Sequence, residues 1–298
     1  MRILSVRYLA AVVLSLGFAV QAGAQVLLTG TLKKARDSGA VAIGYRASSI
    51  PFSYLSTRGE PIGYAIEICR ALVDAMGEEV GRTLRIDWVP VTAESRLDAV
   101  ESGKVDLECG STTSNLERQK RVAFSPTTFV SGTKLMVKKD SSIASFRDLL
   151  GKRVLVTAGT TNEKTMRELS EKFRLNLTLV VARDHADAFA QLAADQAVAF
   201  ATDDVLLYGL LAENKAQGSY AVVGEFLSYD PYGIMFRKGD APLASLVDAS
   251  FRRMAEDRDL ERAYERWFLR RLPSGISINL PMSPQLTTIF QSLLQKPE

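Results

Sequence analysis

The sequence predicts an α/β protein with two lobes, each built on an open, mostly parallel sheet with helices on both faces. Short β-rich runs alternate with amphipathic helical stretches, and the alternation occurs in two successive sets joined by extended segments. The chain has 298 residues, of which 47% are hydrophobic and 24% charged. This length and composition allow two hydrophobic cores and exclude a disordered or low-complexity chain.

The first 24 residues have the layout of a secretory signal peptide. Arg2 and Arg7 precede the apolar run Tyr8–Val20, which is followed by the small residues Ala22-Gly23-Ala24. The run is shorter than the roughly 20 apolar residues that span a bilayer. We therefore expect cleavage after Ala24 and export, in place of a membrane anchor.

The charge and the histidine and cysteine content of the chain exclude several functions. Loss of the two signal-peptide arginines reduces 37 basic residues to 35, against 34 acidic ones, and no basic run remains. This balance argues against a nucleic-acid partner. One histidine and two cysteines leave little material for a zinc site, and we expect no cofactor and a monomer. After export, Cys69 and Cys109 can pair, as their even number favours, or remain buried thiols.

Lobe 1 is expected to start with residues 25–130. Its predicted elements are, in order, the strand Ala40–Tyr45, the helix Ile66–Met76, the strand Leu84–Val89, the helix Glu94–Glu101 and the strand Val105–Cys109. The extended run Phe129–Lys138 then leads into the second set of elements.

Lobe 2 is expected to comprise residues 131–229. Its predicted strands are Lys152–Val156, Leu177–Val181 and Ala197–Ala201, and its predicted helices are Thr161–Phe173, Ala186–Ala193 and Asp204–Asn214. A second extended segment, Tyr220–Phe236, returns the chain to lobe 1, so the two crossings predict a hinge. Residues 230–272, with the helical tail Leu243–Leu269, belong to lobe 1. Residues 273–298 form a C-terminal extension with a short apolar helix, Leu286–Leu294.

Capping motifs follow a predicted strand in each lobe. Ser114 and Glu117 have capping-box spacing, which predicts a helix that begins just after Thr113. Arg118 lies one turn into this helix, and a helix N-terminus beside a guanidinium suits a carboxylate. Lobe 2 repeats the spacing at Thr160 and Glu163. A single motif of this kind is typical of an ordinary cap, but two of them at strand ends indicate a ligand site.

Other polar residues lie at equivalent strand ends. Arg46 follows the strand Ala40–Tyr45, and Arg96 lies in the first turn of a helix that we expect Thr92 to cap. His185 and Asp203 follow two strands of lobe 2. Because open α/β sheets bind ligands at the carboxyl ends of their strands, these four residues are candidates for ligand contact.

Several stretches match the motifs of one known family. They are Gly44-Tyr45-Arg46, Pro51-Phe52-Ser53-Tyr54, Asp106-Leu107-Glu108-Cys109-Gly110-Ser111-Thr112-Thr113, Glu117-Arg118-Gln119-Lys120, Gly159-Thr160-Thr161-Asn162-Glu163, Asp184-His185 and Ala199-Phe200-Ala201-Thr202-Asp203-Asp204. The chain from Thr31 to Leu269 resembles extracytoplasmic solute-binding proteins of ABC importers, in particular those for glutamate and aspartate. The resemblance implies a type II periplasmic-binding-protein fold, a ligand cleft between the lobes, a periplasmic location and a membrane permease as partner.

The resemblance also implies which residues hold the groups that all amino acids share. Arg118, helped by Thr113 and Thr161, would hold the α-carboxylate. Asp203, with Ser111, would hold the α-ammonium group.

The ligand side chain is assigned in the same way. Arg46, Arg96 and His185 would surround a side-chain carboxylate, and Phe52 would form an apolar wall. The chain departs from the acidic-ligand members at Ala93, where they have serine, so the ligand range is in question. Some members have a cysteine near the position of Ile234 that pairs with the counterpart of Cys109; here the resemblance implies Cys69 as its partner.

The charge of this set favours an acidic ligand. Three arginines and Asp203 give +2 with His185 neutral, and glutamate or aspartate adds −1. A neutral amide would leave Arg46 and Arg96 without an anion, and an unpaired buried charge costs roughly 3–5 kcal/mol. Contact between His185 and a carboxylate further predicts an affinity that rises as the pH falls toward 6.

Two alternatives to a binding protein for acidic amino acids are considered: one differs in its ligand, and the other is an enzyme. A general binder of polar amino acids would use the same Arg118 and Asp203 without selecting an acidic side chain. An exported enzyme similar to cyclohexadienyl dehydratase would need a positioned general acid, and Asp203 is the only candidate in the predicted cleft.

Overall fold

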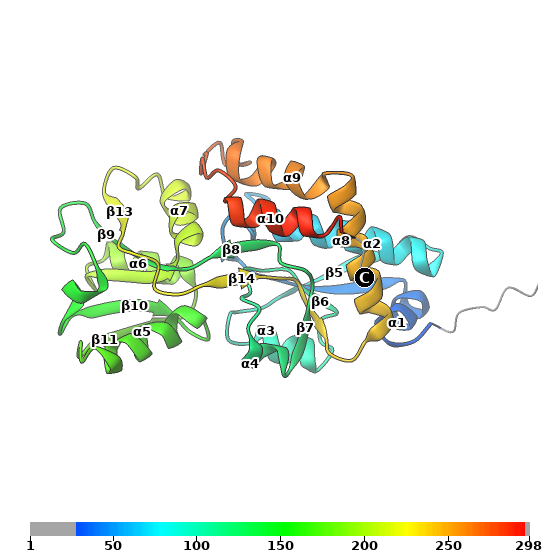
Figure 1. Cartoon of the computed structure of the whole chain (residues 1–298), viewed down its shortest axis with the longest axis horizontal. Coiled ribbons are helices and arrows are strands. Elements are labelled where there is room, and N and C mark those ends of the chain that lie inside the picture. Colours follow the sequence, from blue (N-terminus) through cyan, green and yellow to red (C-terminus); the bar gives the residue numbers. More distant parts are fainter. Residues whose placement is uncertain (1–27, 296–298) are drawn as a thin grey trace, which may run out of the picture.

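Two five-stranded mixed sheets form the centres of two lobes in the computed structural model, which describes residues 28–295 (Figure 1). The predicted two-lobed α/β class is therefore confirmed. The predicted signal peptide lies outside the described residues.

The lobe 1 sheet has the strand order β5-β1-β6-β15-β7. Strands β1 (Ala40–Tyr45), β5 (Arg85–Pro90) and β6 (Leu107–Glu108) are parallel, and β15 (Met235–Arg237) and β7 (Val122–Phe124) extend the sheet by antiparallel pairing. A small sheet of β2 (Ser48–Ser49), β3 (Ser53–Leu55) and β4 (Pro61–Ile62) lies beside it. The helices of this lobe are α1 (Gly30–Ser38), α2 (Tyr64–Val80), α3 (Arg96–Glu101), α4 (Leu116–Gln119), α8 (Ala241–Glu256), α9 (Asp259–Tyr264) and the π-helix η2 (Glu265–Leu269). Helix α1 was not expected from the sequence.

The lobe 2 sheet has the order β11-β10-β12-β9-β13. Strands β10 (Arg153–Thr157), β11 (Thr178–Ala182) and β12 (Ala199–Asp203) are parallel, and β9 (Thr133–Lys138) and β13 (Tyr220–Val223) join by antiparallel pairing. The helices are η1 (Phe146–Leu149), α5 (Thr161–Lys172), α6 (His185–Ala193) and α7 (Asp204–Glu213).

Helices cover both faces of the lobe 2 sheet because alternate strand residues point to opposite faces. Val154 and Val156 of β10 belong to the core cluster that includes Met166 of α5. Leu155, between them, belongs to the cluster with residues of α6 and α7, such as Leu207. A strand buried on both faces reads as a continuous apolar run, and this explains why the sequence pattern identified it.

Two antiparallel strands, β8 (Phe129–Ser131) and β14 (Asp230–Tyr232), connect the lobes and form the predicted crossings (Figure 1). Gly132 separates β8 from β9, and a Cβ atom there would lie 2.3 Å from the carbonyl oxygen of Ser228. The rings of Phe129 and Tyr232 pack with Phe52 in an aromatic cluster beside these strands. The crossing strands are therefore anchored in the core of lobe 1.

The C-terminal extension packs on lobe 1 through α10 (Pro284–Ser292), which lies close to β8 (Figure 1). Leu286 and Phe290 of this helix are buried in the lobe 1 core. The side-chain amide of Gln285 donates to the hydroxyl of Tyr229, which directly precedes β14, at 3.0 Å. The extension thus contacts both segments that connect the lobes.

A disulfide joins Cys69 of α2 to Cys109, which directly follows β6. Their Cα atoms are 6.3 Å apart and both residues are fully buried. The predicted pairing is confirmed.

We expect the exported protein to show no alkylatable thiol before reduction and two after reduction and unfolding, as measured by intact mass. Because the disulfide closes a loop of 40 residues, the double variant Cys69→Ser, Cys109→Ser should lose up to about 4 kcal/mol of unfolding free energy. Two thiols that react without reduction would contradict the pairing.

Candidate ligand-binding site between the lobes

A small cavity lies between the lobes at the carboxyl ends of the parallel strands, and residues of both lobes line it. Seven of the nine residues predicted to bind ligand are among them: Arg46, Arg96, Ser111, Thr113, Thr161, His185 and Asp203. Thr160, Asn162 and Leu206 complete the lining. The two sheets therefore bring together residues that are far apart in the sequence, as expected for strand ends in open α/β sheets.

Arg118 lines a neighbouring cavity, together with Ala93 and Gly159. Its Nη1 donates to the carbonyl oxygen of Thr113 at 3.0 Å, and its Nη2 donates to the carbonyl oxygen of Gly159 in lobe 2 at 3.3 Å. Burial and the charge of Arg96 lower the pKa of Arg118 to about 9, so the guanidinium stays charged at neutral pH. Arg118 thus connects the two lobes at the edge of the site.

One of the predicted helix caps near the site is wrong. Asn115 caps α4, since its side-chain oxygen accepts from the backbone N–H of Arg118 at 2.9 Å, so the expected capping box of Ser114 does not form. Asparagine one position later competes for the same role. Ser95 directly precedes α3 but makes no side-chain cap, whereas the Thr92 hydroxyl accepts from the backbone N–H of Ser95 at 3.1 Å, as expected of a cap at the entry to this helix. In lobe 2 the expected cap is confirmed, because Thr160 accepts from the backbone of Glu163 at 3.1 Å.

Phe52 is buried in the aromatic cluster and is not among the residues that line the cavity. Its ring centroid lies 5.0 Å from that of Phe129 and 5.1 Å from that of Tyr232. It supports the connecting strands, and its role as a wall of the ligand site stays a prediction.

Arg46 and Arg96 place two guanidinium groups at the cavity. Each is only 2% exposed. Nη1 of Arg96 donates to Thr112 Oγ1 at 2.7 Å and to the carbonyl oxygen of Ser111 at 3.2 Å, whereas its Nε has no partner within residues 28–295. Neither Nη atom of Arg46 has a hydrogen-bond partner within the same residues. Burial, followed by the charge of Arg96, lowers the pKa of Arg46 to about 10, so both buried cations remain available to an anion.

His185 is the first residue of α6 and is 1% exposed. Its Nδ1 lies 2.9 Å from Thr157 Oγ1. Burial and the charges of Arg46 and Arg96 lower the pKa of His185 well below its usual value, so the ligand-free protein favours the neutral imidazole. This desolvation beside two cations, which the sequence does not display, weighs against the expected rise in affinity toward pH 6.

Asp203 ends β12 and is held by two residues that the sequence did not single out. Asn162 donates to its Oδ1 at 2.9 Å, and the hydroxyl of Tyr232 donates to its Oδ2. Burial and the nearby charge of Asp230 raise the pKa of Asp203 to about 7. The carboxylate is thus oriented by lobe 2 and by a connecting strand, and it titrates near neutrality.

Two further buried carboxylates correct the charge of the site. Glu108 accepts from Thr112 Oγ1 at 2.7 Å, and Asp230 accepts from Thr113 Oγ1 at 3.1 Å. Three arginines therefore face three carboxylates, in place of the single one counted from the sequence. Strand position could have identified Glu108, which lies in β6 directly before the polar loop.

A model of the bacterial extracellular solute-binding proteins, family 3, matches residues 41–270. The chain belongs to this family. It is thus a member of a family of binding proteins and not of enzymes. Within residues 28–295, this solute-binding protein has no group of three or more His, Cys, Asp or Glu residues that could hold a metal ion. The same part of the chain contains no helix long and apolar enough to cross a membrane.

Known proteins resemble the solute-binding protein over most of its length. It is 40% identical to the L-glutamate/L-aspartate-binding protein of Pseudomonas aeruginosa over 272 residues, which cover 90% of each chain. It is 35% identical to the glutamate/aspartate import solute-binding protein of Escherichia coli, with 94% of each chain covered. An ancestral arginine-binding protein bound to arginine superposes with a TM-score of 0.70 at 28% identity, over 77% of this chain and 98% of that one.

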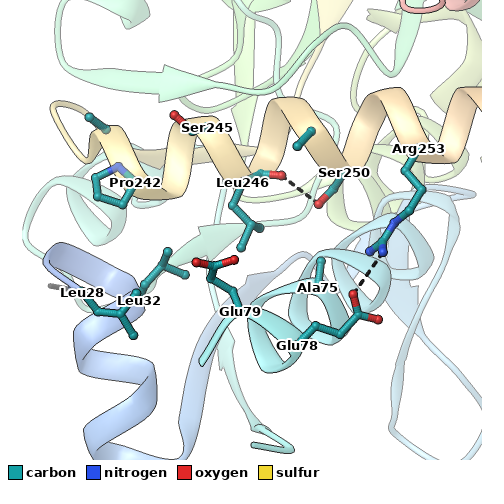
Figure 2. A pocket seen from close by; sticks show the side chains of 12 residues that line it. Leu28, Leu32, Ala75, Glu78, Glu79, Pro242, Ser245, Leu246, Ser250 and Arg253 are labelled. Atoms are coloured by element: carbon teal, nitrogen blue, oxygen red, sulfur yellow. Dashed lines mark hydrogen bonds and ion pairs between the residues drawn. The ribbon is translucent and has the colours of Figure 1, made fainter. Parts of the chain in front are cut away.

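A wider groove lies elsewhere in the solute-binding protein, between α1, α2 and α8 (Figure 2). Its floor is mainly apolar, with Leu32, Ala75 and Leu246. At its edge Arg253 donates to Glu78 at 3.0 Å, so these two charges neutralise each other. Glu79 also points into the groove, but it is exposed to solvent. The cavity between the lobes instead holds buried, unpartnered guanidinium groups and is therefore the candidate ligand site.

Proposed function

We propose that this protein captures glutamate or aspartate in the cavity between its lobes and delivers it to the membrane permease of an ABC importer in the periplasm. The observation that carries the proposal is the pair of buried guanidiniums, Arg46 and Arg96, with unpartnered nitrogen atoms. A ligand carboxylate accepts hydrogen bonds from both and adds a negative charge beside them, whereas a neutral amide adds none. The names of the relatives, which are 35–40% identical, support the same ligand class.

The shared groups of the amino acid are assigned to other residues. The α-carboxylate pairs with Arg118, which lies where the lobes meet. The α-ammonium group pairs with Asp203 and with the hydroxyl of Ser111, which has no protein partner within the described chain. These contacts bind every α-amino acid, so the selection of an acidic side chain rests on Arg46 and Arg96.

Closure of the lobes on the ligand is supported by contacts across the cleft. Thr113 Oγ1 lies 3.2 Å from Thr161 Oγ1, and Lys164 forms an ion pair with Glu117 at 2.7 Å. A Cβ atom on Gly159 would lie 2.6 Å from the Cα atom of Glu94, so glycine permits this close approach. A ligand that contacts both lobes stabilises this arrangement relative to an open one.

Native mass spectrometry of protein purified without added ligand tests the proposal. We expect a fraction of the protein to carry one glutamate or aspartate, identified after release by denaturation. Co-purification of a neutral or basic amino acid alone would favour the general polar amino-acid binder.

Affinity for glutamate should rise about tenfold between pH 6 and pH 8. In the free protein Asp203 titrates with a pKa of about 7, and binding of an ammonium group requires its ionised form. The ionised fraction rises from about 9% to about 91% over this range. Burial and two neighbouring arginines hold the pKa of His185 well below its usual value, and the ligand's own groups do not titrate here.

The control for this prediction is Asp203→Asn, which should bind more weakly at pH 8, retain the order of preference among ligands and lose the pH dependence. Calorimetric titrations at pH 6, 7 and 8 measure both proteins. An affinity of the wild type that rises toward pH 6 would contradict the assignment of Asp203.

A further inference from the structure

Glu108 is a fully buried carboxylate that connects to the candidate site through one hydroxyl group. Its Oε2 accepts from Thr112 Oγ1 at 2.7 Å, and the same Oγ1 accepts from Arg96 Nη1 at 2.7 Å. These two consecutive hydrogen bonds hold Nη1 of the Arg96 guanidinium in position. The unpartnered Nε of Arg96 is left for a ligand.

Glu108 also lies beside Arg46. A Cβ atom on Gly110 would lie 2.4 Å from Glu108 Oε1 and 2.9 Å from Arg46 Cγ, so both side chains pass the same glycine. Oε1 itself has no hydrogen-bond partner in the described chain. An alanine at position 110 would displace one of the two side chains.

The carboxylate acts on the arginines through space. Burial is the main influence on the pKa of Arg46, Arg96 and Arg118 and lowers all three; Glu108 acts on each in the opposite direction. Within residues 28–295, Glu108 makes no ion pair within 4.0 Å with any of them. It therefore compensates positive charge without using the N–H groups that would bind a ligand.

We infer that Glu108 is a specificity-determining residue, which tunes the cavity to the ligand's charge by compensating part of the arginine charge and by orienting Arg96 through Thr112. The inference rests on the proposed function and extends it. The carboxylate stabilises the ligand-free protein, which otherwise holds buried guanidiniums without counter-ions, and it weakens the attraction for an anionic side chain.

Glu108→Gln tests the inference, because glutamine has the same shape and can still accept from Thr112 but carries no charge. We expect the ratio of the dissociation constants for glutamine and glutamate to rise about tenfold relative to the wild type. The melting temperature of the ligand-free variant should fall, and the increase on adding glutamate should be larger than in the wild type.

Asp106→Asn is the matched control. Asp106 is also a buried carboxylate in the same segment, but it accepts from Lys34 at 2.8 Å and from the backbone of Ala42 at 2.9 Å. This variant should lose stability without a change in the glutamine-to-glutamate ratio. Thr112→Val keeps the Glu108 charge and breaks the connection to Arg96, so it should lower the ratio.

The outcomes separate the inference from the proposed function. A wild type that binds glutamate and glutamine equally contradicts the proposed function. A wild type that discriminates, with an unchanged or lower ratio in Glu108→Gln, contradicts the inference alone. If Glu108→Gln does not fold, the ratio in Thr112→Val decides, and an unchanged ratio there refutes the connection through Thr112.

Discussion

Arg118→Ala is expected to abolish detectable binding of every amino acid. The α-carboxylate is common to all of them, and Arg118 is the guanidinium assigned to it. Loss of a buried pairing of this kind costs roughly 3–5 kcal/mol, which weakens binding by at least about a hundredfold. The same residue donates to the carbonyl oxygen of Gly159 in lobe 2, so its loss also removes a contact of the closed arrangement. Titration with glutamate, aspartate and glutamine measures the effect.

The matched control for Arg118→Ala is Arg121→Ala. Arg121 is an exposed arginine that pairs with Asp98 and Glu101 on the surface of lobe 1. Its removal should leave the affinity within about twofold of the wild type, because exposed ion pairs contribute little. Retained glutamate binding in Arg118→Ala would place the α-carboxylate elsewhere in the cleft.

Arg46→Gln is expected to reduce the preference for glutamate over glutamine about tenfold or more. In the wild type, the ligand carboxylate forms charge-assisted hydrogen bonds with Arg46 as well as with Arg96. A glutamine at position 46 offers an uncharged amide to both ligands and so favours neither of them. The same substitution should raise the unfolding free energy of the ligand-free protein, because it removes a buried cation that has no hydrogen-bond partner for either Nη atom in the described chain. Opposite effects on selectivity and stability are typical of a residue kept for binding.

Calorimetry with both ligands and chemical denaturation without ligand measure the two effects of Arg46→Gln. Arg85→Gln is the control, since Arg85 pairs with Asp87 on the surface at 2.9 Å. It should change neither quantity by more than about 1 kcal/mol. An Arg46→Gln variant with full selectivity would show that the side-chain carboxylate does not bind there.

Hydrophobic periodicity predicted most of the fold because it reports burial directly. The predicted strand Lys152–Val156 differs from β10 by one residue at each end. The predicted extended run Phe129–Lys138 corresponds to β8 and β9, which Gly132 separates. Helix α1 was missed. Helix boundaries depend on which of several neighbouring polar residues caps the helix, and the sequence around Asn115 offered more than one.

Strand-end position predicted most residues of the candidate site, since a parallel sheet gathers its carboxyl ends at one edge. The partners that lie behind the cavity were missed because their contacts depend on tertiary packing. Tyr232 reaches Asp203 only because β14 crosses beside lobe 2, and Glu108 reaches Arg96 only through Thr112. The lowered pKa of His185 follows from its burial beside two cations, which no local pattern shows.

The most direct test of the central claim is a titration of the wild type with glutamate, aspartate, glutamine and asparagine at pH 8, where Asp203 is ionised. Glutamate or aspartate should bind at least tenfold more tightly than either amide. This ratio requires only about 1.4 kcal/mol, well below the roughly 3–5 kcal/mol cost of one unpaired buried charge. Equal affinities for the acids and the amides would contradict the claim that Arg46 and Arg96 select an acidic side chain.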